Sequence, residues 1–285
     1  MYQGFYNLTS GMLTQQRNLN VVSNNMSNTQ TAGYKSDTMV TSTFQEEMLL
    51  RTGRVSKGNP QDMGITSKIR TQTETITDYE QGSMEDTGSN LDFAIMGEGF
   101  FSVQTPGGVQ YTRNGSFMID DEGYLSISGR SGEGRVLGTD GQPILIKDER
   151  FSVDSDGNIY APKPDPVKKS EDDEEEETEY ETDENGNIIL PPPEKYGQIA
   201  VTRFDDVSTL HREDNGLYTS PNQGTIVNGQ DGSQILWKNL EKSNVDMVQE
   251  MTTLMSSQRA LQSAAQMLRM YDQVMGKSSS DVGRL

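Results

Sequence analysis

The chain has 285 residues, enough for one large domain or two smaller ones, and it carries a formal net charge of −19. A negative charge of this size argues against nucleic-acid binding through a basic patch. The absence of cysteine excludes disulfides, thiolate chemistry and cysteine-ligated metals. No apolar run approaches transmembrane length, so we expect no insertion into a membrane.

The first segment, residues 1–35, predicts a long amphipathic helix from about residue 2 to residue 28. Its start, MYQGFYNLTS, has neither a basic region nor a continuous apolar core and therefore does not predict a cleavable signal peptide. Apolar residues recur every seven positions, with a second row in which Gln15 fills one place. The rows comprise Phe5, Met12, Leu19 and Met26, and Leu8 and Val22.

The stretch SNNMSNTQTAGYK, residues 23–35, predicts the end of this helix. Asn24, Asn25 and Asn28 are expected to bond to nearby backbone groups and stop the helix. Gly33 allows a turn with positive φ, and Tyr34 is expected to anchor the outgoing chain by burying its ring. Uncharged amides also suit a packed junction between subunits, where a charge would need a partner.

Residues 36–86 are rich in Thr, Ser, Gln and Gly and predict an extended arm, with one short helical piece near residues 44–50.

Residues 87–236 predict a mainly antiparallel β domain. Hairpin turn signals such as DDEGY (120–124), TDGQP (139–143), SDGNI (155–159) and EDNGLY (213–218) alternate there with short β-branched and aromatic runs.

An acidic insert at about residues 163–195 interrupts this β domain. Residues 165–187 alone carry a net charge of −10, more than half of the total. Such a block of like charge predicts a disordered surface loop, and a calcium-binding strip is the alternative.

The last segment, residues 237–285, predicts a second heptad helix. Ser243 and Asn244 are candidate caps, and Gly276 with Lys277 predicts its end. One seven-residue row is apolar, and a second row four residues later contains Met251, Gln258 and Ala265 and is broken at Asp272. The first row comprises Met247, Leu254, Leu261, Leu268 and Met275.

The predicted fold class is therefore α+β, with a long helix at each end and an antiparallel β middle. The heptads alone fit two arrangements. The helices could be core helices closing on one sheet, or they could form a coiled-coil-like pair with each other or with copies of themselves.

The sequence shows no recognisable motif for catalysis or for cofactor binding. The two Asp/Asn-rich stretches that resemble calcium loops have glycine at the fourth position and lack the terminal glutamate, so we interpret them as hairpin turns. MGEGFF (96–101) lacks the third glycine of a dinucleotide-binding loop. We expect no catalytic residues, no cofactor and no metal site, and hence no enzyme.

Three stretches together resemble one family. LTSGMLTQQRNLNVVSNNMSNTQTAGYKS near the start is similar to the N-terminal signature of the flagellar basal-body rod protein family, which is related to the flagellar hook protein. GEGFF, YTRNG, GYL and LG-x-x-G in the middle resemble its core domain, and NLEKSNV opens a stretch similar to its C-terminal helix. The blocks occur in the family's order over most of the chain, and the acidic insert departs from the family pattern.

The resemblance implies a structural subunit of the rod, of the distal or the proximal kind. Such subunits leave the cell through the flagellar type III export apparatus without a cleaved signal. Their terminal helices pair, self-assemble into a hollow helical shaft with other rod and hook proteins, transmit torque from motor to hook, and line the channel for exported subunits. The alternatives are a hook-type axial protein and, from another class, a secreted cation-binding or adhesive β-protein.

Overall fold

A computed structural model describes residues 2–44, 47–51, 61–66, 69–128, 134–146, 150–161, 195–213, 215–227 and 233–282. The chain forms two compact units. The first unit combines Met1–Glu80 with Ser243–Leu285, and the second is Gln81–Lys242. The acidic insert lies, apart from Lys195, outside the described residues, so neither interpretation of it is tested.

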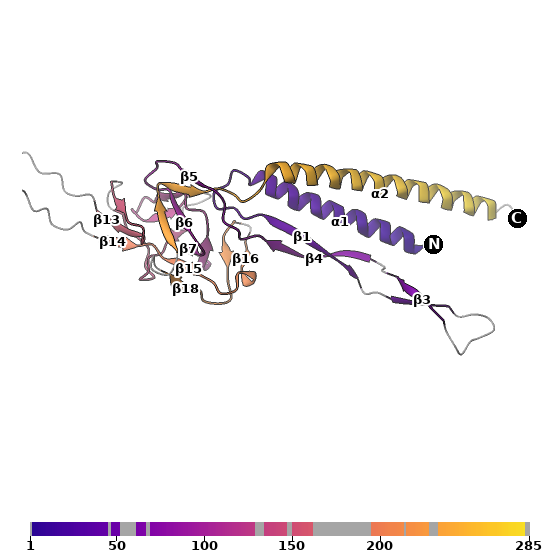
Figure 1. Ribbon diagram of the computed structural model, residues 1–285, viewed down its shortest axis with the longest axis horizontal. Coiled ribbons are helices and arrows are strands. Elements are labelled where there is room, and N and C mark those ends of the chain that lie inside the picture. Colours follow the sequence, from indigo (N-terminus) through magenta and orange to yellow (C-terminus); the bar gives the residue numbers. More distant parts are fainter. Residues whose placement is uncertain are drawn as a thin grey trace, which may run out of the picture. The chain divides into compact units, whose positions relative to one another are not determined.

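The first unit contains the two helices, α1 (Tyr2–Ser27) and α2 (Met247–Val282), which lie side by side and run antiparallel (Figure 1). Both helices were predicted, and α1 ends within one residue of the expected position. However, α2 continues past Gly276, which therefore does not end it. One helical glycine costs only about 1 kcal/mol relative to alanine, too little to stop a long helix. Neither of these helices contains a stretch long and apolar enough to cross a membrane.

The arm of the first unit is a β-ribbon. Strand β1 (Asp37–Phe44) pairs antiparallel with β4 (Ile69–Thr77), with a register shift between Val40 and Thr41. Strand β2 (Glu47–Arg51) pairs with β3 (Gln61–Thr66). The short helix predicted near residues 44–50 is therefore wrong, because the described part of that stretch belongs to β1 and β2. Helix α1 packs on β1 and β4 as well as on α2.

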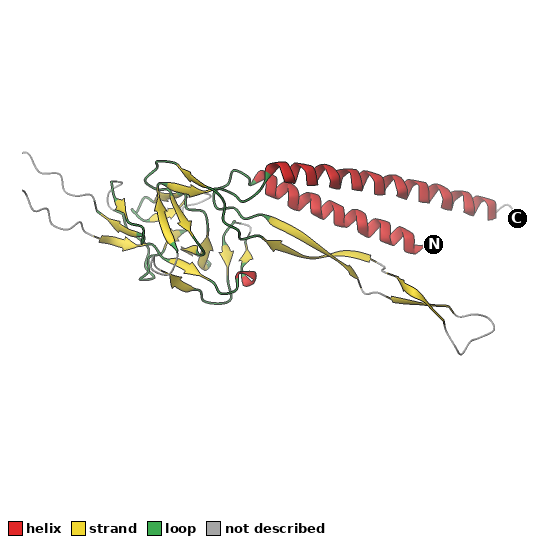
Figure 2. Ribbon diagram, in the orientation of Figure 1, coloured by secondary structure: helices red, strands yellow, loops and turns green. Residues whose placement is uncertain are grey.

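The second unit is built almost wholly of short strands (Figure 2). In chain order they are β5 (Met84–Asp86), β6 (Phe93–Met96), β7 (Phe100–Thr105), β8 (Gly108–Thr112), β9 (Phe117–Ile119), β10 (Leu125–Ile127), β11 (Arg135–Val136), β12 (Ser152–Val153), β13 (Asn158–Tyr160), β14 (Lys195–Gln198), β15 (Val201–Arg203), β16 (His211–Arg212), β17 (Tyr218–Thr219), β18 (Thr225–Val227), β19 (Gln234–Trp237) and β20 (Asn239–Glu241), with a 3-10 turn η1 (Val207–Thr209).

One antiparallel sheet of nine strands dominates this unit. Its strands follow the order β16-β17-β8-β7-β11-β10-β9, and β15 joins β7 to β18. Three smaller sheets pair β12-β13-β14, β6 with β19, and β5 with β20. The antiparallel pairing and the α+β class are thus as the sequence predicts.

A single apolar core fills the second unit. Phe93 lies at its centre, with its ring 5.6 Å from that of Phe117 and 6.4 Å from that of Phe151. The buried core residues are Phe93, Ile95, Phe101, Phe117, Leu125, Val136, Ile144, Ile146, Phe151, Ile159, Ile199, Val201, Val227 and Ile235.

The hairpin signals fall at turns. Gly123 follows β9 with φ 85° and donates its N–H to the carbonyl of Asp120. Gly157 has φ 78° between β12 and β13, and Gly216 has φ 82° between β16 and β17. These glycines occupy the left-handed conformation that such turns require.

Candidate assembly site: the terminal helices

Polar side chains join α1 to α2. Asn18 Nδ2 donates to Ser257 Oγ at 3.0 Å, and Asn25 Nδ2 donates to Glu250 Oε1 at 2.9 Å. Asn18 and Asn25 lie seven residues apart on α1. Their partners, Ser257 and Glu250, also lie seven residues apart on α2, in the opposite order because the helices are antiparallel. The two bonds therefore join positions that are one heptad apart on each helix.

The same register continues to the N-terminal end of α1. A Cβ atom on Gly4 would lie 3.7 Å from Cε2 of Tyr271, an ordinary contact distance, so these two residues are neighbours across the two helices. Gly4 lies two heptads before Asn18, and Tyr271 lies two heptads after Ser257. We call Gly4, Asn18, Asn25, Glu250, Ser257 and Tyr271 the facing row.

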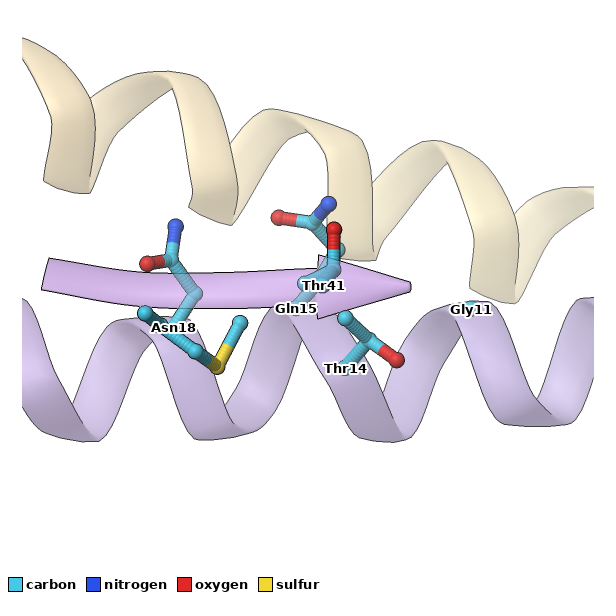
Figure 3. A pocket seen from close by; sticks show the side chains of 6 residues that line it. Gly11, Thr14, Gln15, Asn18 and Thr41 are labelled. Atoms are coloured by element: carbon cyan, nitrogen blue, oxygen red, sulfur yellow. The ribbon is translucent and has the colours of Figure 1, made fainter. Parts of the chain in front are cut away.

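A groove of about 210 Å³ opens between α1 and β1, beside the facing row (Figure 3). Gly11 leaves space there, since no atom lies within 4 Å of the position that its Cβ would take. In Figure 3, Gln15 and Asn18 extend from α1 toward α2. The lining residues are Gly11, Thr14, Gln15, Asn18, Met39 and Thr41.

Asn25 is the centre of a polar cluster and is only 1% exposed. Its Nδ2 donates to the Asp37 carbonyl and to Glu250, both at 2.9 Å. Its Oδ1 accepts from the Tyr34 hydroxyl at 3.1 Å and from the Asp37 N–H at 3.0 Å. Both donors and both acceptor positions of the amide are thus used. Asn25 was expected to act as a local helix stop, but it instead connects α1, β1 and α2.

Asn28 does end the helix locally, as predicted. Its Nδ2 donates to the Asn24 carbonyl at 2.9 Å and to Asn24 Oδ1 at 3.1 Å. Gly33 then turns the chain with φ 67°, and Tyr34, whose ring is half-buried, points its hydroxyl back to Asn25. The bond from Asn28 Nδ2 to the Asn24 carbonyl satisfies one of the backbone carbonyls that a helix end leaves free.

The start of α2 is capped by Asp246, whose Oδ1 accepts from the N–H groups of Val248 at 2.9 Å and Gln249 at 3.4 Å. A carboxylate at this position satisfies free N–H groups and favours the positive end of the helix dipole. Of the two predicted caps, Ser243 accepts from the Val245 N–H at 3.3 Å, one turn too early to cap the helix.

Asn244, the other predicted cap, ties chain segments together instead. Its Oδ1 accepts from the Ser36 N–H at 2.8 Å, and its Nδ2 donates to the carbonyls of Asp78 at 2.9 Å and Glu80 at 3.2 Å. Lys35 is 2% exposed and donates to the same Glu80 carbonyl at 2.7 Å. The end of α1, the end of the arm and the start of α2 are therefore joined by one polar network.

The predicted apolar rows differ in burial. On α1, Val22 is buried and Phe5 is exposed, and the half-buried residues are Leu8, Met12, Leu19 and Met26. On α2, Met247 is exposed, and the half-buried residues are Leu254, Leu261, Leu268 and Met275.

The second row predicted on α2 is mostly exposed. Met251, Gln258 and Asp272 are exposed, and Ala265 is half-buried. The row one residue earlier is more buried and contains Glu250, Ser257, Ala264 and Tyr271. The prediction followed apolar residues, whereas this more buried row consists mainly of small and polar ones.

Large apolar side chains remain exposed on both helices. Val248 is 74% exposed and is the most exposed of them. On α1 the others are Phe5, Tyr6 and Leu13, and on α2 they are Met247, Met251, Met255, Met267, Met270 and Val274. We call this set the outer apolar face.

Comparison with known proteins places these features in a family. Residues 5–35 match the model described as flagella basal body rod protein, residues 94–133 the flagellar hook protein FlgE/F/G D1 domain, and residues 238–281 the flagellar basal body rod FlgEFG protein C-terminal model. The flagellar basal-body rod protein FlgF of Caulobacter vibrioides is 31% identical over 97% of this chain and 95% of its own length. The chain belongs to the flagellar basal-body rod protein family.

Two further relatives agree with this. The rod protein FlgG of Bacillus subtilis is 30% identical over 96% of this chain and 97% of its own length. The hook-basal body complex protein FlhO of the same organism is 26% identical over the full length of both chains. The family is one of structural proteins, and it occupies the flagellar basal body.

Two rod-family motifs meet in the second unit. Arg113, from YTRNG, donates its Nε to Glu241 Oε2, from NLEKSNV, at 2.6 Å, and both side chains are at most 5% exposed. The guanidinium also donates to the carbonyls of Gly99, Ile95 and Gly97. The Gly82 N–H donates to Glu241 Oε1 at 3.0 Å. Arg113, which directly follows β8, therefore links Glu241 on β20 to the backbone of β6 and of the loop between β6 and β7.

Sequence reasoning missed Glu250, Ser257 and Tyr271 on α2 and the partners of Arg113. A seven-residue spacing of small and polar residues, opposite a similar spacing of Gly4, Gly11, Asn18 and Asn25, is the signal that was present for the helices. No local pattern joins Arg113 to Glu241, because 128 residues separate them.

Proposed function

We propose that this chain, a structural subunit of the bacterial flagellar basal-body rod, polymerises through the outer apolar face of α1 and α2. The observation that carries the proposal is the division of side chains on the two helices. Small and polar residues occupy the facing row, while large apolar side chains elsewhere on both helices are exposed. An apolar face of this kind is covered only when another helix packs on it.

The helix pair itself is a coiled-coil-like antiparallel hairpin in this proposal. Support comes from the seven-residue repeat of the facing row, because a strict heptad repeat keeps two helices in contact only when they wind around each other. A buried asparagine at a heptad position fixes register at some cost in stability, and Asn25 has the burial for this role.

Residues 1–35 and 237–285 then form the axial layer, 36–86 an arm, and 87–236 the outer β domain. The proposed assembly residues are those predicted from the heptads and the asparagine stretch: Phe5, Leu8, Met12, Leu19, Val22, Asn24, Asn25, Met26, Asn28, Gly33, Tyr34, Met247, Met251, Leu254, Leu261, Leu268 and Met275. Of these, Asn25, Gly33 and Tyr34 act by holding the helix end in place.

Copies of the chain pack head to tail rather than as closed pairs. A heterologous contact of this kind builds an open helical polymer when its rotation does not close. The partners are further copies and other rod and hook proteins, and the chain reaches them through the flagellar type III export apparatus. The polymer is a hollow shaft that carries torque from motor to hook.

The test places a charge on the outer apolar face. Val248→Asp should abolish motility and external filaments, because an unpaired carboxylate would be buried at the subunit contact. Val109→Asp is the control, since Val109 is likewise an exposed valine, at 50%, but lies on β8 in the second unit. The control strain should swim.

Thermal melting of both purified variants should match the unchanged protein, because each side chain is exposed in the free chain. Normal swimming of the Val248→Asp strain would contradict the proposal. Loss of swimming in both strains would show that the contact is not confined to the helices.

A further inference from the structure

Methionine is concentrated on α2, mostly at exposed positions. The chain has 15 methionines and no cysteine, and six of the 15 lie in this one helix. Five of the six are exposed by 40–57%, namely Met247, Met251, Met255, Met267 and Met270. We call these five the outer methionines. The sixth, Met275, is half-buried.

The spacing of the outer methionines puts them on shared surfaces. Met247, Met251 and Met255 follow one another at intervals of four residues, and Met267 and Met270 are three apart. Helical residues three or four apart are neighbours on one face. Thioethers that reach solvent along a helix are accessible to small oxidants, whereas buried ones are shielded.

We infer that the outer methionines are an oxidation site through which peroxide controls assembly of this subunit. The inference rests on the proposed function, because it gives the outer apolar face a chemical control. It adds that the free subunit is the sensitive form, since the same thioethers are covered once copies have packed together.

The reaction is a two-electron oxidation of sulfur by a peroxide. A sulfur lone pair attacks one oxygen of hydrogen peroxide, the O–O bond breaks, and an S–O bond forms. The transferred oxygen passes its proton to the departing hydroxide, so the products are methionine sulfoxide and water. With no cysteine in the chain, no thiol competes for the oxidant.

The product changes the contact chemistry of the helix. A flexible apolar side chain becomes a polar one with a strong hydrogen-bond acceptor. Burying such a group against an apolar neighbour without a donor is unfavourable. Methionine sulfoxide reductases return the thioether, so the effect is reversible.

The first measurement maps oxidation on the full chain with dilute hydrogen peroxide and peptide mass spectrometry. The outer methionines should oxidise several-fold faster than Met275 on the same helix and Met12 and Met26 on α1. Equal rates at Met275 and the outer methionines would overturn the inference.

The second measurement is sedimentation of the full chain before and after peroxide, and again after treatment with methionine sulfoxide reductases. Oxidation should raise the midpoint concentration for self-association by at least about tenfold, and reduction should restore it. An unchanged midpoint in a chain whose outer methionines are fully oxidised would overturn the inference.

Leucine variants separate this site from other methionines. In a chain with all five outer methionines changed to leucine, peroxide should leave the midpoint concentration for self-association nearly unchanged. The matched control is Met96→Leu with Met118→Leu, because these two residues are 44% and 40% exposed in the second unit. The control should remain as sensitive to peroxide as the unchanged chain, and loss of its sensitivity would refute the assignment to α2.

Failure of the proposed function gives a different result. In that case the untreated chain stays monomeric at every concentration. The oxidation site is then judged by the rate map and by fluorescence of a hydrophobic dye, which should fall on oxidation of the unchanged chain but not of the five-leucine variant. A dye signal that falls equally in both would overturn the inference.

Discussion

Individual buried polar residues hold the first unit in one arrangement. Asn25 makes four hydrogen bonds to three chain segments. An amide can do this because it carries two donors and two acceptor positions, whereas a carboxylate has acceptors only. The groups around residue 25 therefore require a side chain that both donates and accepts, as the amide of asparagine does.

Asn25→Asp tests that argument. The substitution removes both donors and sets a second carboxylate beside Glu250, so we expect the free energy of unfolding to fall by about 2–4 kcal/mol. Asn24→Asp is the matched control, because Asn24 is the exposed neighbour and only accepts from Asn28. It should cost less than about 1 kcal/mol. Denaturation followed by far-UV circular dichroism measures both, and equal losses would contradict the role assigned to Asn25.

The buried ion pair of the second unit, Arg113–Glu241, likewise needs both of its partners. Arg113→Ala leaves the Glu241 carboxylate buried without its cation, so we expect a loss of about 3–5 kcal/mol in unfolding free energy. Lys242→Ala is the control, since Lys242 and Glu85 form an exposed pair at 3.1 Å whose loss should cost less than about 1 kcal/mol. Trp237, the single tryptophan, lies in the second unit and reports its unfolding by fluorescence. A loss under about 1 kcal/mol for Arg113→Ala would refute the stated role.

At the scale of elements, a helix or strand could be predicted from the sequence when residues close to it in the chain determine its structure. Both helices follow from a seven-residue apolar period. The β turn at Gly157 follows from the Asp156–Gly157 pair, and the turn at Gly123 follows from the short acidic stretch Asp120–Gly123. The arm was harder, because β1 (DTMVTSTF) is largely polar and gains its structure from pairing with β4, some 30 residues away. The facing row was missed for another reason. Burial was equated with apolarity, whereas Asn18, Asn25, Ser257 and Glu250 join the two helices by side-chain hydrogen bonds.

Gly115 shows how one motif glycine fixes the packing of strands. A Cβ on this residue would lie 1.7 Å from the Phe93 carbonyl oxygen, and the Phe93 N–H donates to the Gly115 carbonyl at 2.9 Å. Because the obstructing atoms are backbone, they cannot move aside as a side chain could. Glycine in YTRNG is thus required by the strand that follows Asp92.

Gly115→Ala should therefore lower the unfolding free energy of the second unit by about 3 kcal/mol or more, or prevent its folding. The control is Gly107→Ala, where the nearest atom, Thr105 Oγ1, lies 3.7 Å from the added Cβ at an ordinary contact distance. Tryptophan fluorescence during denaturation measures both. A Gly115→Ala chain as stable as the Gly107→Ala chain would contradict the close approach of the strands.

At the scale of the whole molecule, the two units differ in where their apolar side chains lie. The described part of the second unit has a buried apolar core formed by its own residues. The first unit leaves large apolar side chains outside, and its internal contacts use small and polar residues. A chain built in this way gains burial by adding copies of itself, which is the behaviour of a rod subunit.

The most direct test uses the absence of cysteine. A single cysteine introduced by Val248→Cys can be labelled with a maleimide in the free subunit and in the assembled polymer. Labelling should be fast in the free subunit, where the position is exposed, and strongly suppressed in the polymer. A Val109→Cys chain should be labelled equally fast in both states. Equal labelling of the Val248→Cys chain before and after assembly would contradict the claim that the outer face of α2 forms the subunit contact.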